Sequence, residues 1–163
     1  MKKEEFKFGY DLYENIDELN AADAALLKAA REITQKAYAP YSHFLVGAVA
    51  QLQNGETVSG TNQENASYPV GICAERVLLS AASVLHTNVP IDTIAISYHN
   101  TNAGWKSDRP VSPCGMCRQA LREYEDRINQ PIRLILSGME GEVIVLEKAS
   151  QLLPMSFGPG DLK

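Results

Sequence analysis

Apolar residues recur with a helical period in three stretches of the chain. In the first, apolar positions three or four residues apart follow Asn20, a side chain that can cap a helix, and the pattern stops at Pro40. Each of the two later stretches follows a loop and begins at a cysteine. The pattern predicts helices over residues 20–37, 73–86 and 114–128, with a short additional helix over residues 147–152.

Short apolar runs between these stretches have the length and composition of β-strands. The run at residues 44–50 is too short and too rich in β-branched residues for a helix, and the turn sequence at 53–56 leads from it into a second run. In all, the pattern predicts five strands, at residues 44–50, 57–60, 91–97, 132–136 and 143–146. The resulting order αββαβαββα predicts an α/β fold, a three-layer α/β/α sandwich around a central mixed five-stranded sheet.

Length and composition are those of one globular domain. The chain has 163 residues, of which 45% are hydrophobic and 21% charged, and these values exclude collagen-like, coiled-coil and disordered chains. Residues 1–19 are charged and aromatic without a clear period, so we interpret them as an N-terminal tail or arm. Residues 20–163 contain no internal repeat or linker and are predicted to form a single catalytic domain.

The charge pattern favours a small-molecule ligand. Fifteen Lys and Arg against 20 Asp and Glu give a net charge of -5, and without a basic run a nucleic-acid partner is not expected. No apolar stretch approaches the roughly 20 residues of a membrane-spanning helix, and the first residues lack a secretory apolar core. We therefore expect a cytoplasmic protein without a membrane partner.

The three cysteines have the spacing of a metal site. Cys114 and Cys117 form a C-x-x-C motif, and Cys73 lies 41 positions before Cys114. All three are expected near helix N-termini, where the helix dipole favours the thiolate that binds metal. Zinc accepts sulfur ligands tetrahedrally, and three protein ligands leave its fourth position open for water. The pattern predicts one catalytic Zn²⁺ per chain.

Two residues beside Cys73 have charges suited to such a site. Glu75 lies in the same predicted first turn, where its carboxylate can take a proton from the activated water and pass it to a substrate nitrogen. Arg76 follows, and its charge can offset the excess negative charge of three thiolates. We predict Glu75 as the catalytic acid–base and Arg76 as a residue that tunes the metal ligands.

Other interpretations of these residues are possible when each motif is taken alone. A single C-x-x-C also occurs in thiol redox proteins and in structural zinc sites. Neither kind of protein requires a third cysteine such as Cys73 with a glutamate, Glu75, close to it in the sequence. A structural site would need a fourth ligand, and none of the three histidines is suitably spaced. Without the cysteines, Asn62 and Glu64 would be taken as turn residues, Phe44 and Phe157 as core aromatics, and Arg76 as a solvated charge.

The two cysteine motifs together resemble the zinc signature of cytidine deaminases. The matching residues are Cys73-Ala74-Glu75-Arg76 and the segment Pro113–Gln119. The C-A-E form is similar to that of small enzymes that act on free nucleosides. The resemblance extends from about residue 20 to residue 162 and includes three further segments, at 39–48, 62–68 and 152–157.

The resemblance implies a function and a set of binding residues. It implies zinc-dependent hydrolytic deamination of cytidine and deoxycytidine to uridine and deoxyuridine in pyrimidine salvage, and it implies a homotetramer with shared active sites. Deamination of another cytosine nucleoside such as blasticidin S remains an alternative, as does a zinc-binding interaction module without activity. The implied substrate-binding residues are Asn62 and Glu64 for the ribose hydroxyls, Phe44 for the base face, Ala74 with Glu75 for the pyrimidine edge, and Phe157 for a neighbouring subunit's pocket.

Two segments depart from the family pattern. Val77-Leu78-Leu79 replaces a smaller stretch that usually contains threonine, and the segment from His99 to Pro110 is longer than the short loop that usually connects this strand to the next helix. The first change is expected to affect only helix packing. The second is expected to alter the rim of the pocket or a contact between subunits.

Overall fold

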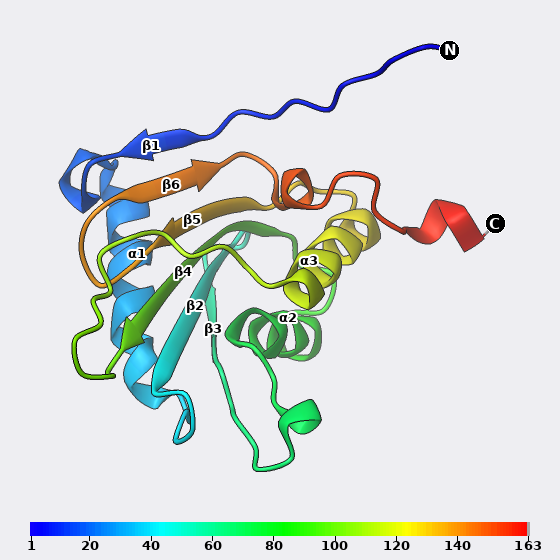
Figure 1. Ribbon diagram of the computed structural model, residues 1–163. Helices are drawn as coiled ribbons and strands as arrows, with labels where there is room; N and C mark the ends of the chain where they lie inside the picture. The colour runs from blue at the N-terminus through cyan, green and yellow to red at the C-terminus, as the bar shows by residue number, and fades with distance from the viewer. Residues whose placement is uncertain (163) are drawn as a thin grey trace.

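One six-stranded mixed sheet forms the centre of the computed structural model, which describes residues 1–162, and helices cover both of its faces (Figure 1). The strand order is β1-β6-β5-β4-β2-β3, and β4 and β5 are the neighbours that run parallel. No helix within these residues is long and apolar enough to cross a membrane. The strands are β1 (Asp11–Tyr13), β2 (Phe44–Leu52), β3 (Thr57–Thr61), β4 (Ile91–Asn100), β5 (Arg133–Ser137) and β6 (Val143–Leu146).

The helices divide between the two faces because strand residues alternate in direction. Helix α1 (Ala21–Ile33) buries Leu27 and Ala30 against Val49 and its neighbours on one face. Helices α2 (Ala74–Leu85) and α3 (Gly115–Ile128) cover the other face, where Ala48 and Ala50 lie. This arrangement confirms the predicted three-layer α/β/α fold. The predicted short helix after β6 is a 3-10 helix at Ala149–Leu152.

The sheet contains one strand more than the five predicted. β1 lies in the segment interpreted as a tail or arm, and its residue Leu12 is opposite Ile144 in an antiparallel pair with β6. Sequence alone did not indicate this strand, because it has only three residues and none of them is buried. The three residues of β1 are extended because they pair with the exposed edge of β6.

The start of α2 is held close to the sheet by a glycine. A Cβ at Gly60 in β3 would collide with the carbonyl oxygen of Ala74 and the amide nitrogen of Leu78. Only glycine therefore allows this approach, which places the first turn of α2 directly on β3. The residues at that turn, Cys73 and Glu75, are fixed relative to the sheet as a result.

β2 and β4 extend to the same end of the sheet. β4 continues to Asn100, three residues beyond the predicted end, because Phe44 at the start of β2 pairs with it. This extension places Phe44 and Tyr98 on one face of the sheet, where their rings stack with centroids 4.7 Å apart and planes 13° apart. The stacked pair forms one wall of the cavity described below.

Candidate active site

Two helix N-termini bring the three cysteines together. Cys73 caps α2, Cys114 caps α3, and Cys117 lies in the first turn of α3. The Sγ atoms of Cys73 and Cys114 are 3.7 Å apart, and those of Cys114 and Cys117 are 3.5 Å apart. Sulfur atoms bound to one tetrahedral zinc ion are separated by about 3.8 Å, given Zn–S bonds of about 2.3 Å. The three side chains therefore fit a single zinc ion.

The three thiols interact with one another. All three cysteines are free, and their three sulfur atoms lie within 4.8 Å of one another. A hydrogen bond with Cys117 lowers the pKa of the Cys73 thiol, whereas the same interaction, together with burial, raises the pKa of Cys117. Within residues 1–162, no histidine or carboxylate joins this cluster. Three sulfur ligands without a fourth side chain are suited to a zinc ion that also binds water.

A cavity of about 430 Å³ adjoins the thiols and contains the Glu75 side chain in its lining. Glu75 is only 5% exposed, and burial raises the pKa of its carboxyl group. Cys73 and Cys114 line the same cavity. The cavity thus combines a group that can exchange protons with two of the candidate metal ligands. Ala74, also in the lining, is fully buried beside Glu75.

Arg76 lies outside this cavity. Its side chain is half-buried and lines a groove between α2 and α3 together with Tyr124 and Arg127. Within residues 1–162, no hydrogen bond joins its guanidinium to a cysteine sulfur. Its positive charge nevertheless lowers the pKa of Cys73, in addition to the larger effect of Cys117. Arg76 therefore acts on the thiols through its charge at a distance.

Asn62 lines the cavity and also fixes the start of β2. Its Oδ1 accepts a hydrogen bond from the Val46 amide at 2.7 Å, and its Nδ2 donates to the Phe44 carbonyl at 2.9 Å. A side-chain amide has two N–H groups, so one donor remains for a ligand. Asn62 thereby positions Phe44 in the cavity wall and can contact a ligand itself.

Glu64 lines the cavity from the segment that follows β3. Its Oε2 accepts hydrogen bonds from the backbone N–H groups of Tyr41 at 2.9 Å and Ser42 at 3.2 Å. Burial opposes ionisation, but these bonds and one from the Ser42 hydroxyl outweigh it and lower the pKa of Glu64. Glu64 is therefore ionised at neutral pH, and among the described residues no backbone N–H group donates to its Oε1 atom.

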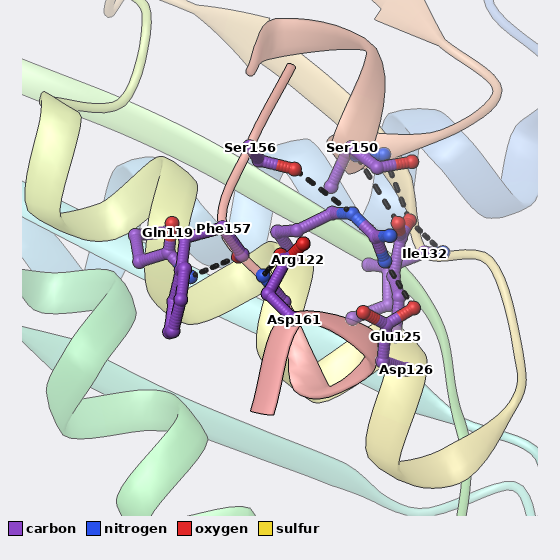
Figure 2. Close-up of polar contacts among 11 residues, drawn as sticks. Gln119, Arg122, Glu125, Asp126, Ile132, Ser150, Ser156, Phe157 and Asp161 are labelled. Atoms are coloured by element: carbon purple, nitrogen blue, oxygen red, sulfur yellow. Dashed lines mark hydrogen bonds and ion pairs between the residues drawn. The ribbon is translucent and has the colours of Figure 1, made fainter. Parts of the chain in front are cut away.

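Phe157 does not line the cavity of its own chain. Its side chain is 59% exposed, and Figure 2 shows it beside Gln119, whose Nε2 donates to the Phe157 carbonyl at 3.0 Å. The hydroxyl group of the neighbouring Ser156 accepts a hydrogen bond from Arg122, which lies in α3 as Gln119 does. The C-terminal segment is thus fixed on α3, and the aromatic ring is accessible from outside the chain.

The structure brings most of the predicted site residues into one place. The cavity lining includes seven of them, while Cys117 contributes through its sulfur and Arg76 and Phe157 lie outside. Tyr98 was not predicted from the sequence, although alternation along β4 could have placed it on the face of Phe44. Val111 and Ser112, which lie in an irregular loop without periodicity, were not predicted either. The seven lining residues are Phe44, Asn62, Glu64, Cys73, Ala74, Glu75 and Cys114.

Comparison with known proteins identifies the family. Residues 20–130 match the model of the cytidine and deoxycytidylate deaminase zinc-binding region. Cytidine deaminase of Halalkalibacterium halodurans is 34% identical over 137 residues, which cover 84% of this chain and 95% of the relative. A crystal structure of cytidine deaminase from Burkholderia pseudomallei superposes with a TM-score of 0.70 at 36% identity, over 85% of this chain and all of that chain.

A less similar relative bears on the alternative substrate. Blasticidin-S deaminase of Bacillus cereus is 29% identical over 140 residues, which cover 85% of this chain and 94% of the relative. Its alignment covers about the same share of this chain as that of the cytidine deaminase from Halalkalibacterium halodurans, but its sequence identity to this chain is lower. The family match, the extent of these alignments and the geometry of the three thiols agree. The chain belongs to the cytidine and deoxycytidylate deaminase family that carries this zinc-binding region.

Proposed function

We propose that the chain catalyses the hydrolytic deamination of cytidine and deoxycytidine to uridine and deoxyuridine, with release of ammonia. The observation that carries the proposal is the buried carboxyl group of Glu75 in the same cavity as Cys73 and Cys114. The cavity of about 430 Å³ is of the size used for small ligands. A net charge of -5 also favours a nucleoside over a polynucleotide.

In this proposal the side chains of Cys73, Cys114 and Cys117 hold the zinc ion. When bound, zinc supplies Lewis acidity that activates a water molecule for attack on C4 of the cytosine ring. Glu75 accepts the proton that this water loses and delivers it to N3 of the ring. The same carboxyl group then carries a proton to the departing amino group. One water is consumed, and one ammonia is released for each uridine formed.

The remaining lining residues orient the nucleoside. Phe44, backed by the stacked ring of Tyr98, offers an aromatic face for the base. Glu64 Oε1 accepts no backbone hydrogen bond, and Asn62 has one amide N–H without a partner among the described residues, so both can bind sugar hydroxyls. This polar pair favours an ordinary pentose sugar and so supports cytidine over blasticidin S.

Parallel assays with cytidine, deoxycytidine and blasticidin S test the proposal. We expect loss of the cytosine absorbance near 290 nm with the first two. E75Q should retain zinc but lose at least about 100-fold in kcat, because the amide cannot accept the proton. E32Q, which changes an exposed glutamate on α1, is the matched control and should keep full activity. Turnover of cytidine by E75Q within about tenfold of the unmodified protein would remove Glu75 from the mechanism.

We further propose a homotetramer in which Phe157 completes the pocket of a neighbouring subunit, with the enzyme acting in cytoplasmic pyrimidine salvage. The support is the position of Phe157, which is exposed and lies outside its own cavity. F157A should raise KM while zinc content is unchanged, and M155A, which truncates another exposed apolar side chain, should not. Light scattering after size exclusion measures the assembly. A fully active monomer would contradict the shared site.

A further inference from the structure

The loop between β4 and α3, residues 101–113, is held firmly against the sheet. In Figure 1 this yellow-green segment leaves the end of β4 and crosses toward α3. Ser107 is 7% exposed, and its Oγ accepts a hydrogen bond from the backbone N–H of Asn100 at 2.9 Å. A Cβ at Gly138 would collide with the carbonyl oxygen of Ser107. The 101–113 loop therefore has one defined position, although it contains no regular structure.

Asn102 connects this loop to Ser42, a residue that lines the substrate cavity. Its Nδ2 donates to the Ser42 carbonyl at 2.7 Å and to Asn100 Oδ1 at 2.8 Å. The Asn102 backbone N–H also donates to Asn100 Oδ1, at 3.1 Å. Asn100 thus fixes the orientation of the Asn102 amide, and the amide in turn holds the backbone at Ser42.

The backbone turn that contains Ser42 is held from two sides. On one side, Glu64 Oε2 accepts hydrogen bonds from the Tyr41 and Ser42 amides. On the other, the Asn102 side chain donates to the Ser42 carbonyl, and the Thr101 backbone N–H donates to the His43 carbonyl at 3.0 Å. His43 has a φ of 55°, in the left-handed region that is unfavourable for residues other than glycine. Such a turn keeps its shape only when its surroundings constrain it.

Of the two Glu64 carboxylate oxygens, Oε1 accepts no backbone hydrogen bond and is the one that we assign to a ligand. Oε2 is used by the turn, so the direction of Oε1 depends on where the Tyr41 and Ser42 amides lie. Asn102 binds the carbonyl group of Ser42, whose backbone N–H donates to Glu64. A shift of Ser42 would rotate the carboxylate and move Oε1 relative to the sugar.

We propose that Asn102 is a positioning residue for sugar recognition, which acts through Ser42 on the orientation of Glu64. The inference rests on the proposed function, in which Glu64 accepts a hydrogen bond from a sugar hydroxyl. Asn102 does not line the catalytic cavity and touches no reacting atom. Its effect is therefore confined to substrates that carry the hydroxyl which Glu64 binds.

Kinetics of N102A with two substrates test this role. With cytidine, we expect KM to rise about three- to tenfold, which corresponds to one lost hydrogen bond, while kcat stays within about twofold. With 2′,3′-dideoxycytidine, which lacks both ring hydroxyls, N102A should equal the unmodified protein. In the background of E64Q, N102A should add less than about twofold to KM. A general loss of structure would affect both substrates alike.

The controls separate this proposal from its premise. K106A changes an exposed residue of the same loop and should leave KM unchanged. Calorimetry with uridine measures binding without turnover and should show the same loss for N102A. If N102A fails to fold, N102D, which keeps the shape but removes the donor, provides the comparison. Equal affinity of N102A and the unmodified protein, or an equal penalty with dideoxycytidine, overturns the positioning role. An unmodified protein that binds no nucleoside overturns the proposed function as well.

Discussion

Removal of the Glu125 carboxylate should destabilise the chain strongly, because this buried side chain on α3 accepts three hydrogen bonds from the backbone. Glu125 is 6% exposed. Its Oε1 accepts hydrogen bonds from the Ile132 amide at 2.8 Å and the Ala149 amide at 3.0 Å, and its Oε2 accepts one from Ser150 at 3.2 Å (Figure 2). One side chain thereby connects α3 to the start of β5 and to the 3-10 helix after β6.

The expected loss in the free energy of unfolding depends on the number and kind of these hydrogen bonds. A hydrogen bond to a charged group contributes about 1.5–3 kcal/mol, and a neutral bond about half of that. E125Q can keep the two bonds at one oxygen in neutral form, but its NH₂ group faces the Ser150 amide, so the third bond is lost. Contributions of bonds to one side chain add incompletely, so we expect E125Q to lower the free energy of unfolding by about 2–4 kcal/mol, less than the simple sum. E125A loses all three acceptors and should cost about 4–6 kcal/mol.

Urea denaturation of the unmodified protein, E125Q and E125A measures these differences. E123A is the control, because Glu123 lies two residues earlier on the same helix and is exposed; it should change the free energy of unfolding by less than about 0.5 kcal/mol. A loss of stability that is largest for E125A, smaller for E125Q and negligible for E123A is the result expected for a buried carboxylate that accepts hydrogen bonds. If E125A unfolds within about 1 kcal/mol of the unmodified protein, the three bonds contribute little and the reasoning is refuted.

Three further predictions concern the metal site and α1. C114A should lose stoichiometric zinc by metal analysis of the purified protein, because two sulfur ligands remain from the cluster of three; full zinc content in C114A would exclude this site. R76A should lower kcat or zinc retention more than it raises KM, since its charge offsets the thiolates from outside the cavity; a raised KM alone would instead indicate substrate contact. A hydrogen bond from Arg133, opposed by burial, lowers the pKa of Asp23. Because the folded-state pKa is depressed, the Asp23 contribution is complete at neutral pH and is lost as pH falls below about 4. D23N should therefore unfold more easily than the unmodified protein at pH 7, and a difference that persists unchanged at pH 3 would contradict the ion pair.

The helices and their starting points could be predicted because their signals are local. Asn20 caps α1 through a hydrogen bond from the Asp23 amide, a pattern visible within four residues of sequence. Cys73 and Cys114 occupy the N-cap positions of the other two helices, where the sequence predicted the helices to begin, although their side chains form no capping hydrogen bond. β1 had no such local signal, because its extended form depends on a partner strand more than 130 positions away.

The site could be predicted as a set of residue types but not as a geometry. The spacing of Cys73, Glu75 and Cys114 reflects two helix N-termini, and the fold brings these termini together at the cavity. The location of Arg76 depends on the packing of α2 against α3, which the sequence does not encode in a short motif. Its guanidinium therefore lies in the groove between the helices and not beside the sulfur atoms.

The least predictable part of the site is the 101–113 loop, and the reason is the kind of interaction that fixes it. The loop is held by single hydrogen bonds and close backbone contacts, such as that of Asn102 with a carbonyl 60 positions earlier in the chain. An asparagine in a loop is most often a local turn residue, so its identity gives no hint of a distant partner. The sequence nevertheless predicted that this connection is longer than is usual in the family. A longer connection beside a family pocket acquires a fixed position only if it forms new contacts, and here those contacts reach the turn that orients Glu64. In the proposed function, sugar recognition therefore depends on a segment outside the two cysteine motifs.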